Sequence, residues 1–220
     1  MLLNSPHNPT GRVLSRAELE AVAAVCVEHD LVAITDEVYE HLVFDGEHVP
    51  LATLPGMAER TLTISSLGKT FSFTGWKVGW ATGPPPLVGA AAAVKQFLSF
   101  AGGTPLQHAA AHALTHGGDA VGALVAGLRE RRDRLCDGLE AAGFGVHRPA
   151  GTYFVNADVR PLGEDDGVAF CHALPARAGV VAVPAAAFYD DPTAGRHLVR
   201  FAFCKRTDVL DEAIRRLATL

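Results

Sequence analysis

Short apolar segments separated by one helical segment constrain the fold of the first third of the chain. Residues 31–35 and 61–64 are runs of Leu, Val, Ala, Ile and Thr, which are typical of strands buried in a parallel sheet. Residues 1–4 have the composition expected at the end of another such strand. A helix is predicted after Ser15, because Glu18 completes a capping box with it. This order of strand, helix and strand predicts an α/β fold with a mostly parallel sheet.

Polar side chains follow each of these predicted strands. Asn8 follows the first strand, Asp36 and Tyr39 follow the second, and Ser66 and Lys69 follow the third. In sheets with parallel strands, ligands bind outside the carboxyl ends of the strands. We therefore expect these five side chains to converge on one ligand site.

Lys69 lies in a segment rich in hydroxyl groups, where a lysine could bind phosphate, act as a general base or act as a covalent nucleophile. A phosphate-binding P-loop requires a glycine five residues before Gly68, and that position is Thr63. Ser66 and Lys69 have the spacing of a serine–lysine pair of penicillin-recognising enzymes, but the chain lacks their Ser-Asp-Asn and Lys-Thr-Gly motifs. A lysine that forms a Schiff base with a carbonyl compound remains possible.

Composition argues against several classes of partner. Of the 220 residues, 49% are hydrophobic and 20% are charged, so the chain can bury a sizeable core. The net charge of −5, with no basic run among aromatic residues, argues against nucleic acid as a partner. No apolar run reaches the roughly 18 residues that suggest a membrane span. We expect a cytoplasmic protein with neither a nucleic-acid nor a membrane partner.

Three histidines share one face of a predicted helix. His108, His112 and His116 are spaced four residues apart, a spacing that zinc can use. No carboxylate or cysteine completes a site beside them, so no metal is expected and a helix or subunit surface is the preferred interpretation.

Three regions are predicted along the chain. Residues 1–100 form part of a large ligand-binding domain, residues 101–143 are long connecting helices, and residues 144–220 form a small α+β domain. Glycine pairs at 102–103 and 117–118 interrupt the helical region. The small domain is predicted to contain strands at 153–157, 180–183 and 198–203 and helices at 167–178 and 208–220.

The polar residues at the strand ends would suit an aromatic aldehyde cofactor. Such a cofactor needs an amine for its carbonyl, a carboxylate for its ring nitrogen, hydrogen-bonding groups for its phenolic oxygen, and a hydroxyl and a cation for its phosphate. In that order, the chain offers Lys69, Asp36, Asn8 with Tyr39, and Ser66 with Lys77.

Five motifs then resemble those of the class I/II pyridoxal-phosphate aminotransferases. They occur in the same order and cover essentially the whole chain: Asn8-Pro9-Thr10-Gly11, Thr35-Asp36-Glu37-Val38-Tyr39, Ser65-Ser66-Leu67-Gly68-Lys69-Thr70-Phe71, Gly75-Trp76-Lys77-Val78-Gly79 and Arg200-Phe201-Ala202-Phe203. The chain resembles most the branch of N-succinyldiaminopimelate, kynurenine and methionine aminotransferases. The resemblance implies the C-terminal part of a fold type I transferase.

The resemblance also implies a role for each candidate residue. Lys69 would bind the aldehyde of pyridoxal 5′-phosphate and move a proton, and Arg200 would bind the substrate α-carboxylate. The remaining cofactor contacts would come from Asp36 at the ring nitrogen, Asn8 and Tyr39 at the phenolic oxygen, and Ser66 and Lys77 at the phosphate. The family further implies a cis bond before Pro9, amino-acid and 2-oxo-acid substrates, and a homodimer.

Members of this family are close to twice as long as this chain. The glycine-rich phosphate loop and the first strands of the large sheet have no counterpart here, so we expect the C-terminal part of a transaminase, from a truncated gene or from a start inside a longer frame. An inner strand would then lie at an open edge of the sheet. The alternatives are a β-lyase of the same fold, a non-catalytic remnant, or the effector-sensing domain of a regulator.

Overall fold

The computed structural model describes residues 1–220. The chain forms two compact units. The first contains residues 1–7 and 13–125, and the second contains residues 8–12 and 126–220. The division of the chain into three regions stays a prediction.

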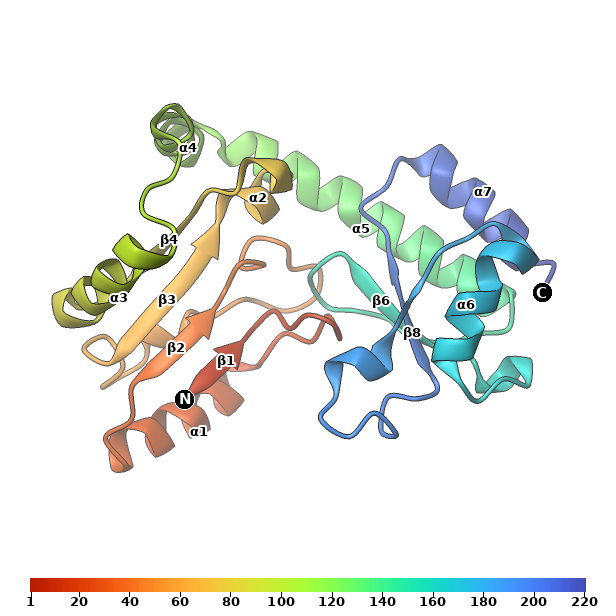
Figure 1. Ribbon diagram of the computed structural model, residues 1–220, viewed down its shortest axis with the longest axis horizontal. Coiled ribbons are helices and arrows are strands. Elements are labelled where there is room, and N and C mark those ends of the chain that lie inside the picture. The colour runs from red at the N-terminus through yellow and green to blue at the C-terminus, as the bar shows by residue number, and fades with distance from the viewer. The chain divides into compact units, whose positions relative to one another are not determined.

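The first unit contains a four-stranded sheet in the order β1-β2-β3-β4 (Figure 1). The first three strands are parallel and β4 is antiparallel to β3, so the sheet is mostly parallel as predicted. The strands are β1 (Leu2–Asn4), β2 (Ala33–Asp36), β3 (Thr61–Ser66) and β4 (Gly79–Thr82). The helices that begin in this unit are α1 (Arg16–Glu28), α2 (Leu67–Thr70), α3 (Pro85–Leu98), α4 (Thr104–His116) and α5 (Gly118–Ala141).

Helix α1 covers one face of this sheet. It begins at the predicted capping box, where the Ser15 hydroxyl accepts from the Glu18 amide and the Glu18 carboxylate accepts from the Ser15 amide at 2.9 Å. Its apolar stripe packs with the segment between residues 49 and 57 and with the start of β2. The resulting core consists of Leu19, Ala23, Cys26, Ala33, Val49, Leu51, Leu54 and Met57.

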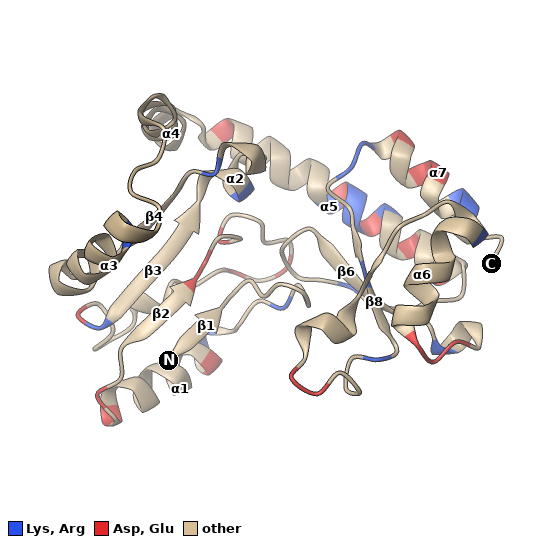
Figure 2. Cartoon of the chain, in the orientation of Figure 1, with Lys and Arg blue, Asp and Glu red and all other residues tan.

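The opposite face of the sheet is partly open, which differs from the expectation of strands buried on both sides. Leu2 on β1, Ile34 on β2 and Ile64 on β3 are all exposed. Helix α3 has no buried residue and carries a single charged residue (Figure 2). Its Phe97 is 86% exposed. A groove of about 550 Å³ separates α3 from β2 and β3.

The second unit contains an antiparallel sheet in the order β5-β6-β8-β7. Its strands are β5 (Gly145–His147), β6 (Phe154–Asp158), β7 (Val183–Pro184) and β8 (Leu198–Ala202). The later part of α5 contacts α7 (Thr207–Leu217), where Arg134 donates to Asp211 at 2.6 Å, and α6 (Gly167–Ala178) contacts β7 and β8. The predicted α+β composition of this region is therefore found.

Aromatic rings fill the centre of the second unit. Phe144 meets Phe170 and Phe201 edge to face, with ring centroids 5.9 and 5.8 Å apart. Leu135 and Leu139 of α5 are buried in the same unit. Acidic and basic residues both occur along α5 and α7 (Figure 2), and on α5 Arg132 is buried and donates to the Pro149 carbonyl at 3.1 Å.

The strand predicted at 180–183 is wrong in extent. Only Val183 and Pro184 pair with β8, and Val181 is 76% exposed. The strand lies at the sheet edge, and Pro184 cannot donate a ladder hydrogen bond, so the pairing stays short.

None of the helices combines the length and the hydropathy needed to cross a membrane.

Candidate functional site

The carboxyl ends of β2 and β3 bring two of the predicted segments together in the first unit. Asp36 pairs with Ile64 in the parallel register, and the amide of Glu37 donates to the Ile64 carbonyl at 2.9 Å. On the other side of β2, the Asn4 side chain donates to the Asp36 carbonyl at 2.8 Å. The backbone of Asp36 is therefore held from both neighbouring strands.

Asp36 is the last residue of β2, and Tyr39 lies in the turn that follows this strand. The Asp36 carboxylate accepts from the amide of Val38 at 3.3 Å, and Leu42 closes the turn by donating to the Tyr39 carbonyl at 2.8 Å. Tyr39 is only 3% exposed, whereas Asp36 remains partly accessible. The Tyr39 side chain is therefore buried, whereas the Asp36 carboxylate remains available to a ligand.

Lys69 lies on the one-turn helix α2, which follows β3 without a loop. Ser66 is the residue before the first turn, and its side-chain oxygen is buried without a hydrogen-bond partner. Gly68 permits the next turn to approach closely, since a Cβ atom there would lie 3.0 Å from the Cα of Thr74. Lys69 itself is partly accessible.

Lys77 lies in an exposed position just after the short turn at 74–76 and before β4. Its backbone is left-handed, with φ 54° and ψ 42°, which is uncommon for a residue other than glycine. It lines a cavity of about 860 Å³ together with Trp76, Trp80 and Lys95. Lys77 therefore lies outside the sheet, before β4 begins.

Asn8 and Arg200 belong to the second unit, where they contact each other. The Arg200 guanidinium donates from Nη1 to the Asn8 side-chain oxygen at 2.7 Å. It also lies over the rings of Phe154 and Phe188, with centroid distances of 4.0 and 4.5 Å. Phe201, the next residue of β8, is 5% exposed, whereas Arg200 is partly accessible, as expected for neighbours on opposite faces of a strand.

The backbone of the motif that contains Asn8 has two notable features. The peptide bond before Pro9 is cis, as the family resemblance implied, and a second cis bond precedes Pro6. Gly11 has φ +69°, and a Cβ atom at this residue would lie 2.2 Å from the Cβ of Pro149. Only glycine fits this position.

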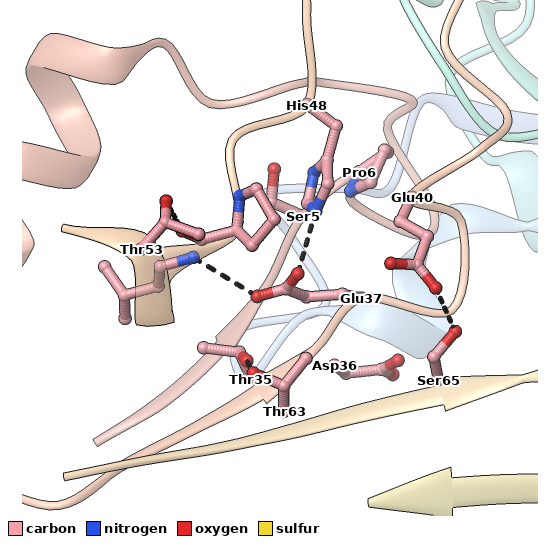
Figure 3. Close-up of polar contacts among 12 residues, drawn as sticks. Ser5, Pro6, Thr35, Asp36, Glu37, Glu40, His48, Thr53, Thr63 and Ser65 are labelled. Carbon is pink, nitrogen blue, oxygen red and sulfur yellow. Dashed lines mark hydrogen bonds and ion pairs between the residues drawn. The ribbon is translucent and has the colours of Figure 1, made fainter. Parts of the chain in front are cut away.

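Sequence reasoning missed the aromatic contacts of Arg200 and a polar cluster beside Asp36. Glu37 and Glu40 lie in the turn after β2, and their carboxylates bond His48 and Ser65 (Figure 3). Acidic residues and histidines are usually solvent-exposed unless they are paired. Glu37, next to Asp36, and His48, in the following loop, were therefore candidates for a buried pair. Nothing in the sequence indicates which of them meet.

Comparisons with known proteins agree with the motifs. Residues 1–217 match the family model for aminotransferase class I and II. The probable N-succinyldiaminopimelate aminotransferase of Mycobacterium tuberculosis is 57% identical over 100% of this chain and 58% of its own length. The kynurenine–oxoglutarate transaminase of Dictyostelium discoideum is 40% identical over 97% of this chain and 54% of its own length.

A solved structure shows the same fold. The structure of N-succinyldiaminopimelate aminotransferase from Mycobacterium tuberculosis matches with a TM-score of 0.97 at 58% identity, over 99% of this chain and 57% of that chain. The predicted fold class is therefore confirmed. The chain spans less than three fifths of the length of these relatives.

Proposed function

This chain belongs to the class I and II aminotransferases, and on that premise we propose that its residues serve the transfer of an amino group between an amino acid and a 2-oxo acid. The amino group and one hydrogen of the donor exchange for the oxo oxygen of the acceptor. The donor becomes a 2-oxo acid, the acceptor becomes an amino acid, and no outside oxidant or reductant is consumed.

The observation that supports this proposal most is the pair Ser66 and Lys69 at the end of β3. A buried hydroxyl without a partner is unfavourable unless a ligand completes it, and a phosphate oxygen would accept its hydrogen bond. Lys69 lies three residues further on, and Asp36 ends the neighbouring strand. These groups fit pyridoxal 5′-phosphate, which when bound supplies an aldehyde and an electron-withdrawing ring.

Each candidate residue of the first unit would then have a defined role. Lys69 would hold the aldehyde carbon through Nζ and would also take and return the proton at the substrate Cα. Asp36 would keep a proton on the ring nitrogen, and Tyr39 would donate to the phenolic oxygen. Ser66 and Lys77 would bind the phosphate.

In the second unit, Arg200 would bind the substrate α-carboxylate. The planar guanidinium donates two parallel hydrogen bonds to a carboxylate, which an ammonium group cannot do. Phe154 and Phe188 hold the plane of this guanidinium, and Asn8 accepts from one of its nitrogens. Asn8 would in addition donate to the phenolic oxygen of the cofactor.

The substrate and the assembly are extensions of the same proposal. We take N-succinyldiaminopimelate as the first amino donor to test, because the relative at 57% identity is named for it. The whole protein would work as a homodimer in the cytoplasm. Residues 1–100 would contribute to the cofactor-binding domain and residues 144–220 to a small domain, joined by residues 101–143.

A chimera tests this function. The chain replaces the matched region of the Mycobacterium tuberculosis relative, which supplies the rest of the polypeptide. We expect amino transfer from N-succinyldiaminopimelate to a 2-oxo acid, and its loss on Lys69→Ala. A folded chimera that releases pyruvate and ammonia from a β-substituted amino acid, without amino transfer, would identify a β-lyase instead. A folded chimera with neither activity would favour the non-catalytic remnant.

A further inference from the structure

Four polar side chains beside the candidate site have no task in the proposed function. Glu37 and Glu40 lie in the turn that follows β2, His48 lies in the loop after this turn, and Ser65 lies on β3 (Figure 3). Glu37, Glu40 and Ser65 are the sequence neighbours of Asp36, Tyr39 and Ser66, respectively.

Glu37 ties the turn to the loop that follows it. Its carboxylate is 3% exposed and bonds Nε2 of His48 at 2.8 Å, and its other oxygen accepts from the amide of Leu51 at 3.4 Å. A carboxylate at this depth requires such partners, because burying it unpaired would be strongly unfavourable. The turn therefore cannot move away from this loop without exposing or unpairing Glu37.

Glu40 ties the same turn to β3. Its carboxylate accepts from the Ser65 hydroxyl at 2.5 Å, and Ser65 is 2% exposed. Ser65 immediately precedes Ser66 and stands four residues before Lys69. One side-chain hydrogen bond thus joins the segment of Asp36 and Tyr39 to the segment of Ser66 and Lys69.

A metal site is a less suitable explanation for this cluster. Ligand atoms of Glu37, Glu40 and His48 all lie within 4.8 Å of one another. A histidine that binds a metal usually donates its second ring nitrogen to a protein acceptor, and Nδ1 of His48 has no such partner. The Glu40 oxygen is already bonded to Ser65. The cluster is therefore better explained by the two pairs themselves.

We propose that the Glu37–His48 and Glu40–Ser65 pairs are positioning elements of the cofactor site, which hold the turn bearing Asp36 and Tyr39 in register with the strand end bearing Ser66 and Lys69. The proposal rests on the proposed function for its purpose, but its geometry is independent of any cofactor. None of the four side chains needs to touch the cofactor or the substrate.

Amide hydrogen exchange on the 220-residue chain without cofactor tests the geometry. The amide of Glu37 bonds the Ile64 carbonyl and reports directly on the contact between the two strand ends. We expect Ser65→Ala to speed exchange at this amide about tenfold, the change expected for the loss of one charge-assisted hydrogen bond. The amides of α1 serve as the internal reference and should keep their rates.

Thr63→Val is the matched control variant. The Thr63 hydroxyl bonds that of Thr35 at 3.3 Å, so it also joins β3 to β2, but it lies before the strand ends (Figure 3). We expect a change of less than about threefold at the Glu37 amide for this neutral pair. Glu40→Gln keeps an acceptor for Ser65 and should fall between wild type and Glu40→Leu. An unchanged Glu37 amide in Ser65→Ala, or an equal rise in the control and in α1, would overturn the proposal.

A second readout adds pyridoxal phosphate and reduces the products with borohydride. Mass spectrometry then compares the pyridoxyl label at Lys69 with that at Lys77. We expect Ser65→Ala to lower this ratio about threefold or more under conditions in which the variant remains folded, whereas Thr63→Val should leave the ratio unchanged. If the wild-type chain shows no preference for Lys69, the proposed function fails, and hydrogen exchange alone still decides whether the two pairs hold the strand ends together.

Discussion

The two units bury their sheets in different ways. In the second unit, Phe144, Phe170 and Phe201 close a core around the antiparallel sheet with helices of the same unit. In the first unit, α1 covers one face of the parallel strands while Ile34 and Ile64 remain exposed on the other. The parallel order of strands therefore persists here without cover on both faces, and apolar surface concentrates on this face and on α3.

The site residues are held differently as well. In the first unit, Asp36, Ser66 and Lys69 take their positions from the backbone at two strand ends. In the second unit, Arg200 takes its position from side chains, namely one amide oxygen and two aromatic rings. Removing one of these rings should therefore act on the arginine site directly, whereas the strand-end site also keeps the backbone pairing of β2 with β3.

The largest expected difference is between a buried phenylalanine of the second unit and an exposed phenylalanine of the first. Phe144→Ala should destabilise the second unit by about 3–5 kcal/mol, because it removes a ring at the centre of the core. Phe97→Ala, on the exposed face of α3, should change stability by less than about 0.5 kcal/mol. Denaturant unfolding of the two variants measures both values. Similar losses in the two variants would contradict the difference between the units.

An intermediate effect is expected at Arg200. Arg200→Lys should lower the stability of the second unit by about 1–2 kcal/mol, since it loses the planar contacts with Phe154 and Phe188 and alters the bond to Asn8. The control is Arg196→Lys. Arg196 forms a half-exposed ion pair with Asp166, so this substitution should change the free energy of unfolding by under about 0.5 kcal/mol. Thermal unfolding distinguishes the two. Equal effects would mean that the aromatic contacts do not hold the guanidinium.

The smallest expected effect is a pH dependence confined to the second unit. Hydrogen bonds from Arg160 hold the pKa of the Asp158 carboxyl below its ordinary value. The stabilisation is therefore complete above the unfolded pKa of about 3.9 and is lost as pH falls through the lower folded value. Asp158→Asn should be less stable than wild type at neutral pH, and the difference should shrink below about pH 4. Asp165→Asn, at an exposed position, is the control. If the stability difference between Asp158→Asn and wild type stayed constant as pH falls, the stabilisation would not come from the ionised Asp158 carboxylate.

Periodic and capped elements could be predicted from the sequence. The capping box of Ser15 and Glu18 predicted the start of α1, and the strand predicted at 198–203 coincides with β8 to within one residue. The glycine pairs at 102–103 and 117–118 correctly separated α3, α4 and α5. Local patterns of this kind are decided by neighbouring residues, so one sequence is enough to read them.

Pairings between distant residues could not be predicted. Arg200 contacts Asn8, Phe154 and Phe188, which are separated from it by 192, 46 and 12 positions, and no local pattern links them. The bond between Glu40 and Ser65 likewise depends on the register of β2 and β3. The short β7 differs from its prediction because exposure at a sheet edge, rather than composition, limited its pairing.

The most direct test of the central claim is the site of cofactor attachment on the unmodified chain. The chain has four lysines, of which Lys77, Lys95 and Lys205 are exposed and Lys69 is only partly accessible. Treatment with limiting pyridoxal phosphate, reduction with borohydride and peptide mapping give the label at each. Our account predicts that Lys69 carries more pyridoxyl label than any of the other three, despite its lower exposure. Labelling that follows exposure, with Lys69 last, would contradict it.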